Sequence, residues 1–263
     1  MKRLLSVMMV LALFLPMISC GEPARALGPG TEEATKAYTV TLTVTDDQTT
    51  DAEGLPMAEY RYEIPEMRTV DGAPESVQAV AETFNGEMRA LLAACMETGR
   101  QLGGWAQADP RVKGGSLYYI DQLTAVWREQ GAVLCVTFQR YQDQMGPHPN
   151  ITHTSRLFNL DRGCYVDPLE LADDPETCRA AVEQQILAEI REDPELEAAL
   201  YDDYADTVAQ WNEACVSLEE DALAVTFSTY TLAPHAMGAL SFRIPYGEAG
   251  LGEGGLALLG ITE

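Results

Sequence analysis

The sequence predicts an α+β protein with mostly antiparallel sheets and packed helices. Apolar residues recur with a period of two in some blocks, which is typical of strands, and at three- and four-residue steps in others, which is typical of helices. These blocks follow the order strands, helix, strands, helices, strands. A parallel sheet would require regular alternation of strand and helix, so this order favours antiparallel pairing.

The first block predicts two strands and a long helix. Residues 38–45 and 57–67 alternate between apolar and polar side chains, and the polar loop between them would let them pair. A helix is expected from about Pro74 to Gly99, because proline near a helix start and glycine near its end are the usual arrangement. The predicted buried stripe of this helix comprises Val77, Val80, Ala81, Phe84, Met88, Leu91, Leu92 and Cys95.

The later blocks predict five more strands and two more helices. The expected strands are residues 116–128, 132–141, 151–160, 222–230 and 239–245. The expected helices are residues 175–191 and a second one from the cap at Asp193 to about Trp211. The glycine-rich tail, residues 247–255, is expected to be loose.

The N-terminus has the pattern of an export signal, which we assign to residues 1–19. Two basic residues precede an apolar run over 4–18, which is too short for a spanning helix. The run ends at Ser19-Cys20, and this ending resembles a bacterial lipobox, in which the cysteine receives a diacylglycerol. An ordinary secretory signal that happens to end in cysteine is the alternative. We expect a lipidated tether over residues 20–35 and a protein held on the extracytoplasmic face of the bacterial cell membrane.

The composition describes a folded and strongly acidic protein. Hydrophobic residues make up 46% of the chain, which argues against disorder. The net charge is −24, and removal of Lys2 and Arg3 with the signal would make it −26. Such a surface repels phosphate backbones, so nucleic acid is not expected as a partner. The charge fits solubility at a cell surface, and it also fits attraction of a cationic partner.

The cysteines leave several arrangements open. Cys95 and Cys135 lie on predicted apolar faces and are expected to be buried. An oxidising compartment would permit a bridge among Cys164, Cys178 and Cys215, but the connectivity does not follow from the sequence.

Three segments together suggest a family. They are MGPHPN at 145–150, FNLDRG at 158–163 with PLEL at 168–171, and TFSTYTLAPHAMG at 226–238 with FRIPY at 242–246. Their order and spacing resemble an extracytoplasmic domain of unknown function. That domain forms the C-terminal, lysozyme-binding part of the anti-sigma factor RsiV and precedes the deacetylase in PdaC-type proteins. Residues 38–128 are similar to the smaller domain that usually goes before it.

The resemblance implies a division into an N-terminal α+β domain, 36–145, and an RsiV-C-terminal-like α+β domain, 146–263. It also implies a surface location and a binding role, with lysozyme as the example of a cationic protein partner. The match is imperfect, because Gly146-Pro147 replaces the usual Gly-Gly or Gly-Ala, and His235 replaces an aromatic residue. We found no anti-sigma domain and no deacetylase domain in the sequence, so neither of those roles is expected here.

The candidate binding residues are His148, Asn150, Pro234 and His235, in the loops 142–150 and 232–238. His148-Pro149-Asn150 is also a typical turn, so the fold alone could require it. A site of three histidines would include His153, but an odd offset of five places it and His148 on opposite faces of a regular strand. We therefore predict no metal and no cofactor.

Catalytic motifs are missing from the sequence, which contains neither GxSxG nor HExxH. The acidic run from Glu192 to Asp206 is interpreted as a solvated helix face. We expect a non-catalytic surface lipoprotein that binds an extracellular protein or a cell-wall ligand. An envelope-acting hydrolase with no recognisable motif is the alternative.

Overall fold

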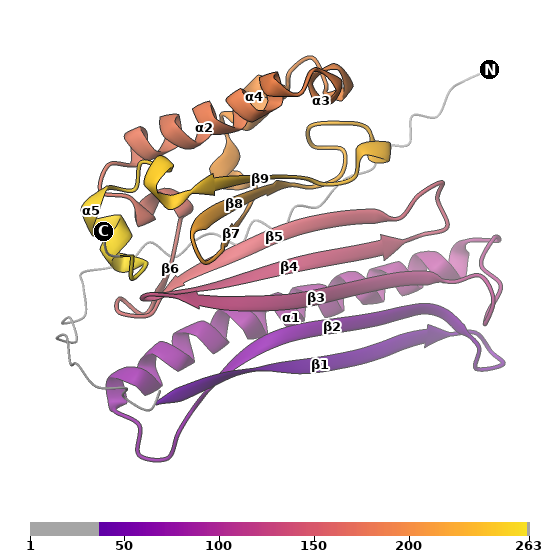
Figure 1. Ribbon diagram of the computed structural model, residues 1–263. Helices are drawn as coiled ribbons and strands as arrows, with labels where there is room; N and C mark the ends of the chain where they lie inside the picture. The colour runs from indigo at the N-terminus through magenta and orange to yellow at the C-terminus, as the bar shows by residue number, and fades with distance from the viewer. Residues whose placement is uncertain (1–36, 262–263) are drawn as a thin grey trace.

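The computed structural model describes residues 37–261 as two sheets with helices packed against them (Figure 1). A six-stranded sheet has the order β1-β2-β3-β4-β5-β6, and a three-stranded sheet has the order β7-β8-β9. The strands are β1 (Tyr38–Thr50), β2 (Pro56–Thr69), β3 (Tyr119–Gln130), β4 (Val133–Asp143), β5 (Asn150–Asn159), β6 (Cys164–Val166), β7 (Cys215–Leu218), β8 (Ala222–Phe227) and β9 (Leu240–Pro245). The helices are α1 (Glu75–Ala108), α2 (Pro175–Glu192), α3 (Pro194–Ala199), α4 (Tyr204–Val208) and α5 (Gly252–Leu258), with 3₁₀ turns η1 (Pro168–Leu171), η2 (Trp211–Glu213), η3 (His235–Met237) and η4 (Tyr246–Glu248).

The predicted α+β class with mostly antiparallel sheets is confirmed. Every strand pair is antiparallel except β2–β3, which runs parallel. The parallel pair arises because α1 connects β2 to β3 and carries the chain back along the sheet, as a parallel connection requires.

Helix α1 covers one face of the six-stranded sheet, as its apolar stripe predicts (Figure 1). Phe84 is completely buried, and its ring lies 5.5 Å from that of Phe158 on β5. The expected end of the helix at Gly99 is wrong, since α1 continues to Ala108. A Cβ on Gly99 would lie 2.7 Å from the Tyr62 hydroxyl and 3.0 Å from the Tyr60 ring, so this glycine permits close packing on β2.

Strand β4 is buried on both of its faces. Leu134 and Val136 belong to the core beneath α1, whereas Val133 and Cys135 belong to the core on the opposite face. The apolar side chains are therefore continuous along the strand instead of alternating with polar ones.

The second core lies between the six-stranded sheet, the three-stranded sheet and α2 (Figure 1). The apolar stripe of α2 is completely buried and comprises Cys178, Val182, Ile186 and Ile190. The second predicted helix, from Asp193 to about Trp211, is wrong as a single element, because the chain forms α3, α4 and η2 there. The chain bends at Tyr201, whose N–H donates to Leu232 O, and it buries Trp211, whose Nε1 donates to Arg179 O at 3.1 Å.

The glycine-rich tail is ordered, contrary to expectation. Its helix α5 is held at the start by Gly254, whose N–H donates to Asp173 Oδ2 at 2.9 Å. At its end, Leu258 O accepts from Ala132 N at 2.8 Å, next to Gly131 in the β3–β4 turn. Gly131 has φ +56°, and a Cβ there would overlap the backbone of Leu258 and Leu259, so only glycine fits beneath the tail.

A buried ion pair lies in the core beneath α1. Asp121 is completely buried, and it accepts from Arg140 Nε at 2.8 Å and from Arg140 Nη2 at 2.6 Å. The Tyr62 hydroxyl donates to the same carboxylate at 2.9 Å. Burial and the Asp121 charge raise the pKa of Tyr62.

The expected domain boundary at 145/146 lies between β4 and β5, which are hydrogen-bonded neighbours in one sheet. The six-stranded sheet therefore continues across that boundary. The expected signal peptide, Cys20 and the tether lie outside the described residues. Within the described part of the chain, no helix combines the length and apolar character needed to cross a membrane.

Candidate binding surface

Two residues of the third family-like segment attach β8 to the side of β5. His153 N donates to Ser228 Oγ at 2.8 Å, and Ser228 Oγ lies 3.4 Å from His153 O. Thr229 Oγ1 donates to Ile151 O at 2.7 Å. Because β6 pairs only with residues 157–159, these side chains satisfy part of the β5 backbone that no strand covers in the described structure. The strand expected to reach residue 230 accordingly ends at Phe227.

The two predicted binding loops meet. The rings of His148 and His235 stack with centroids 4.4 Å apart and planes 13° apart, and Tyr230 lies 5.3 Å from His235. Pro234 stands at the N-terminal cap of η3, and Asn150 opens β5 opposite Gln142. The structure thus brings His148 and His235 together, while Pro234 and Asn150 form the backbone beside them.

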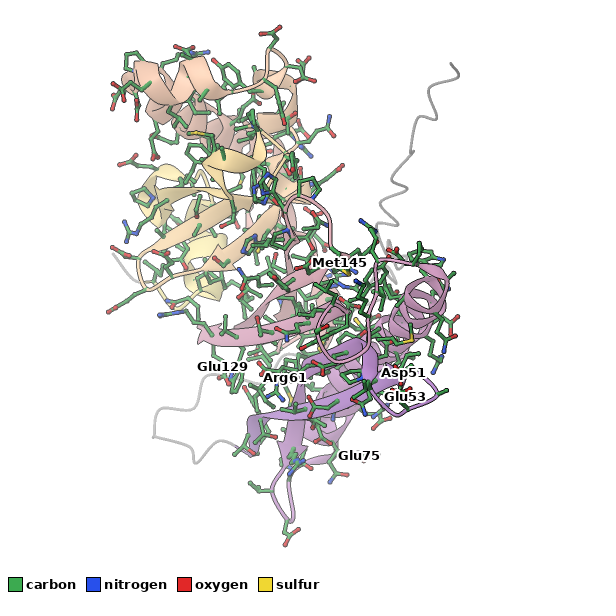
Figure 2. The ribbon with its side chains drawn as sticks, turned by 90° about the vertical axis from the view of Figure 1, so that its right-hand side faces the viewer. Asp51, Glu53, Arg61, Glu75, Glu129 and Met145 are labelled. Carbon is green, nitrogen blue, oxygen red and sulfur yellow. The ribbon has the colours of Figure 1, made fainter. Side chains whose placement is uncertain are left out.

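Two residues near this contact have a strained backbone. Tyr230 has φ +67° and Met145 has φ +57°, and neither is glycine. Such conformations cost about 1–3 kcal/mol each and persist where the surroundings hold them. Met145 is held by Asp143, which accepts from its N–H at 2.7 Å, and by Arg111, which donates to its carbonyl at 3.1 Å. Figure 2 looks at this end of the molecule and labels Met145, which lies between the C-terminal elements and the N-terminal ones.

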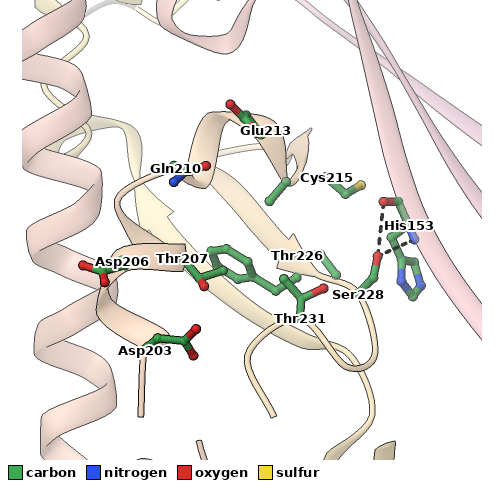
Figure 3. Close-up of a pocket in the computed structure, with 12 residues that line it drawn as sticks. His153, Asp203, Asp206, Thr207, Gln210, Glu213, Cys215, Thr226, Ser228 and Thr231 are labelled. Carbon is green, nitrogen blue, oxygen red and sulfur yellow. Dashed lines mark hydrogen bonds between the residues drawn. The ribbon is translucent and has the colours of Figure 1, made fainter. Parts of the chain in front are cut away.

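A cleft of about 450 Å³ opens beside these loops, between α4, η2 and β8 (Figure 3). Three carboxylates line it, from Asp203, Asp206 and Glu213, and all three residues are exposed. Its lining contains no lysine or arginine. Thr231 also lines the cleft and directly follows Tyr230, so the cleft and the ring cluster of His148, His235 and Tyr230 adjoin each other. Together they form what we call the acidic cleft and its aromatic rim.

The acidic residues of the cleft were interpreted differently from the sequence, as part of a solvated helix face. Both Asp203 and Asp206 are exposed, as that interpretation expects, but the single long helix is broken, so they lie at the start of α4 and line the cleft. The signal for the break is Asp202-Asp203 before Tyr204, since acidic residues are common at a helix start, and α4 begins at Tyr204.

Serine, histidine and aspartate all occur in the cleft, but Ser228 and His153 are not arranged as a catalytic pair. Ser228 contacts the backbone of His153, as Figure 3 shows, and not its ring. The ring Nε2 lies 3.2 Å from Gln139 Nε2, and Nδ1 has no hydrogen-bond partner among the described residues. Burial lowers the pKa of His153, which keeps the imidazole neutral at pH 7. In the described part of the chain, no three potential metal ligands form a group.

The second family-like segment forms turns. Asn159 Oδ1 accepts from the N–H groups of Asp161 and Arg162, both at 3.0 Å. Asp167 and Glu170 form a capping box at η1. These side chains organise the backbone, so this segment supports the fold and not the cleft.

Over residues 37–261, the cysteines that are free and buried are Cys95, Cys135, Cys178 and Cys215. The expected burial of Cys95 and Cys135 is confirmed. Of the three cysteines whose pairing the sequence left open, Cys178 and Cys215 are free, and they serve as core side chains on α2 and β7.

The comparisons with known proteins agree with this architecture. Residues 171–247, which run from the end of η1 through β9, match a family model described as Protein of unknown function (DUF3298). The chain is therefore similar to DUF3298 proteins over most of its second core. No curated protein matched the sequence.

Two crystal structures of DUF3298 family members are similar to most of the chain. One is from Bacteroides fragilis NCTC 9343, with 14% identity and a TM-score of 0.57, covering 80% of this chain and 91% of that one. The other, from Pseudomonas aeruginosa PAO1, has 16% identity and a TM-score of 0.50, covering 84% of this chain and 93% of that one. At these identities the likeness establishes a common fold.

Proposed function

We propose that this protein is a non-catalytic surface lipoprotein that binds a cationic extracellular protein through the acidic cleft and its aromatic rim. The observation that carries the proposal is the cleft itself, whose lining includes three carboxylates and no lysine or arginine. A lysine or arginine side chain of a partner would supply the missing positive charge.

The chemistry of the rim fits the same ligand. Long basic side chains bury their methylene stems on apolar surfaces while their charged ends remain in polar surroundings. The rings of Tyr230, His148 and His235 offer such a surface beside the carboxylates, and Tyr230 is 51% exposed. Cations also bind favourably over the face of a tyrosine ring. The net charge of the chain would speed the encounter with a basic protein.

The family resemblance supports the class of partner, because the related part of RsiV binds lysozyme, which is strongly cationic. A cell-wall ligand was the other expectation, and the acidic cleft favours the protein. A hydrolase would need an activated nucleophile or an acid–base pair. The Ser228 hydroxyl is engaged with the His153 backbone, which does not support that role.

Calorimetry with lysozyme at about 0.15 M salt tests the proposal, since attraction between exposed charges beyond roughly 8 Å is then largely screened. The test variant combines Asp203→Asn, Asp206→Asn and Glu213→Gln. The matched control combines Glu53→Gln, Asp71→Asn and Glu75→Gln, which remove the same charge at exposed positions outside the cleft. Figure 2 shows Glu53 and Glu75 on the N-terminal part.

We expect the cleft variant to bind at least about tenfold more weakly, equivalent to about 1.4 kcal/mol, and the control to bind like the parent. Equal losses in both variants would mean that net charge and not the cleft attracts lysozyme. No binding by the parent chain would exclude lysozyme as the partner.

The proposed lipid anchor has its own test. Cys20→Ala removes the thiol that would carry the diacylglycerol, so the protein should lose its partition into detergent and either appear in the medium or keep its signal peptide. A mutant that partitions like the parent would show that Cys20 is not the anchor.

A further inference from the structure

Strand β1 forms one margin of the six-stranded sheet and extends over Tyr38–Thr50 (Figure 1). In the described structure, β2 is its single hydrogen-bonded neighbour. The other edge of an outer strand offers backbone N–H and C=O groups that can pair with another chain. Most proteins protect such an edge with charges, proline, a bulge or a short strand.

The first eight residues of β1 have none of these protections. Residues 38–45 contain no charge and no proline, and the one irregularity in the pairing falls between Thr49 and Thr50. Asp46 and Asp47 are confined to the second half. Leu42 and Val44 are 38% and 42% exposed, so the unprotected half also presents apolar side chains.

The exposed apolar residues share one face of the sheet. Val44 lies opposite Glu63 in the register with β2, one position from the buried Tyr62, so it points away from the core beneath α1. Leu42 is two residues away and lies on the same face. This face and the free edge meet at Leu42 and Val44, whereas Tyr38 and Val40 of the same strand pack against the core beneath α1.

We propose that two copies of this chain associate through β1, which pairs antiparallel with itself about a twofold axis at Leu42. In this register Leu42 lies opposite the second copy's Leu42, and Val40 lies opposite the second copy's Val44. Leu42 and Val44 of the two copies would form one exposed apolar cluster, bordered by Val40, which packs against the core beneath α1, and cross-strand pairs of this kind are favourable.

The distribution of charge selects a second copy of the chain as the occupant. With Leu42 at the axis, Asp46 lies opposite Tyr38 of the second copy, so the acidic halves stay apart. A register centred on Asp46 would place like charges directly opposite each other, which is destabilising. The uncharged half therefore matches itself under twofold symmetry, as an interface between identical subunits requires.

The association is independent of the cleft, because β1 and β5 lie at opposite sides of the sheet. Both acidic clefts would remain open in the dimer. Two clefts on one particle would let a partner with repeated basic sites bind with higher avidity.

Sedimentation equilibrium of the mature chain carrying Cys20→Ala, so that lipid does not drive association, tests the proposal. Both subunits are strongly acidic, so we expect the dimer to become tighter as salt rises from about 0.05 to 0.5 M, because screening weakens their repulsion. A chain that stays monomeric at about 100 μM protein throughout this salt range would overturn the proposal.

Paired substitutions identify the surface. Leu42→Lys with Val44→Lys places four like charges at the axis and should weaken the dimer at least tenfold. Val126→Lys is the control, since Val126 is 66% exposed but lies on β3, inside the sheet. Circular dichroism confirms that each variant is folded. A dimer that survives the double substitution would place the contact elsewhere and overturn the proposal.

A crosslink provides an independent readout. Leu42→Cys should give a disulfide-linked dimer under mild oxidation by a copper–phenanthroline catalyst in air, because the two thiols face each other across the axis. Val126→Cys and the parent chain should remain monomeric under the same conditions. Equal crosslinking in all three would also contradict the proposed register.

Discussion

The two faces of the six-stranded sheet hold carboxylates in contrasting surroundings. Beneath α1, Asp121 is completely buried, and both of its oxygens accept from Arg140 or Tyr62. On the other side of the sheet, Asp203, Asp206 and Glu213 are exposed around a cleft whose lining supplies no lysine or arginine. A carboxylate whose partners are built into the core serves the fold, whereas a group of carboxylates without such partners is available to a ligand. The comparison predicts large effects on stability on one side and small ones on the other.

The largest effect is expected from Arg140→Met. The change leaves Asp121 buried without its cation, and removal of one partner from a buried ion pair costs about 3–5 kcal/mol. Urea denaturation measures the loss. The control is Arg243→Met, whose ion pairs with Glu219 and Asp221 are exposed and should contribute less than about 1 kcal/mol. Similar losses in both variants would remove the distinction between buried and exposed pairs.

Tyr62→Phe should have the next largest effect. It removes one donor to Asp121 and leaves the ring in place, and a hydrogen bond to a charged group contributes about 1.5–3 kcal/mol. Tyr204→Phe is the matched control, because its hydroxyl donates to Glu197 nearer the surface. If Tyr204→Phe lowered the free energy of unfolding more than Tyr62→Phe in urea denaturation, the hydrogen bond to Asp121 would not be the stronger of the two.

The pH dependence of stability tests the burial of His153, which lies on the cleft side of the six-stranded sheet. Burial lowers the pKa of this residue in the folded protein, so below about pH 6.5 the unfolded chain binds more protons than the folded one. The contribution of the neutral His153 ring to the free energy of unfolding is complete above the pKa of the unfolded chain. It is lost as the pH falls from there toward the lower pKa of the folded protein. Between pH 7 and 5.5, we expect His153 to lower the free energy of unfolding of the parent by about 1 kcal/mol or less. The His153→Gln variant should not show this decrease. Identical pH profiles would show that this imidazole is not protected by burial.

The smallest effect is expected from the cleft. Asp206→Asn changes an exposed side chain with no built-in cationic partner in the cleft lining, so the free energy of unfolding should change by less than about 0.5 kcal/mol. Thermal and urea denaturation both report it. A loss above about 1 kcal/mol would mean that the cleft acids stabilise the fold.

Much of the core beneath α1 was predictable, because its pattern of apolar residues is local in the sequence. The stripe around Phe84 and the alternation of β2 each repeat within a few residues, and both are as expected. Gly99 was misread because its role depends on Tyr60 and Tyr62, which reach it from another element. The tail was misread for the same reason, since Asp173 and the β3–β4 turn order it from far away in the sequence.

In the candidate site too, the residues in recognisable local segments were predicted, and those that depend on distant contacts were not. The family-like segments pointed to the loops that carry His148 and His235, and the structure brings those rings into contact. The carboxylates of the cleft were missed because a continuous helix was expected, and only the burial of Trp211 beneath α2 shows why the chain must break there. The strain at Tyr230 has no signal in the sequence, since tyrosine is not a residue that favours a positive φ.

The contact of the C-terminal helix with Gly131 bears on how the protein matures. A ribosome releases the β3–β4 hairpin long before it releases α5, and Gln130 and Leu259, which join them, are 129 residues apart. Until α5 emerges, Ala132 N lacks its acceptor on Leu258, and Leu259 is missing from the core that covers Val133 and Cys135 on β4. The nascent chain therefore completes its second core only after α5 has been synthesised.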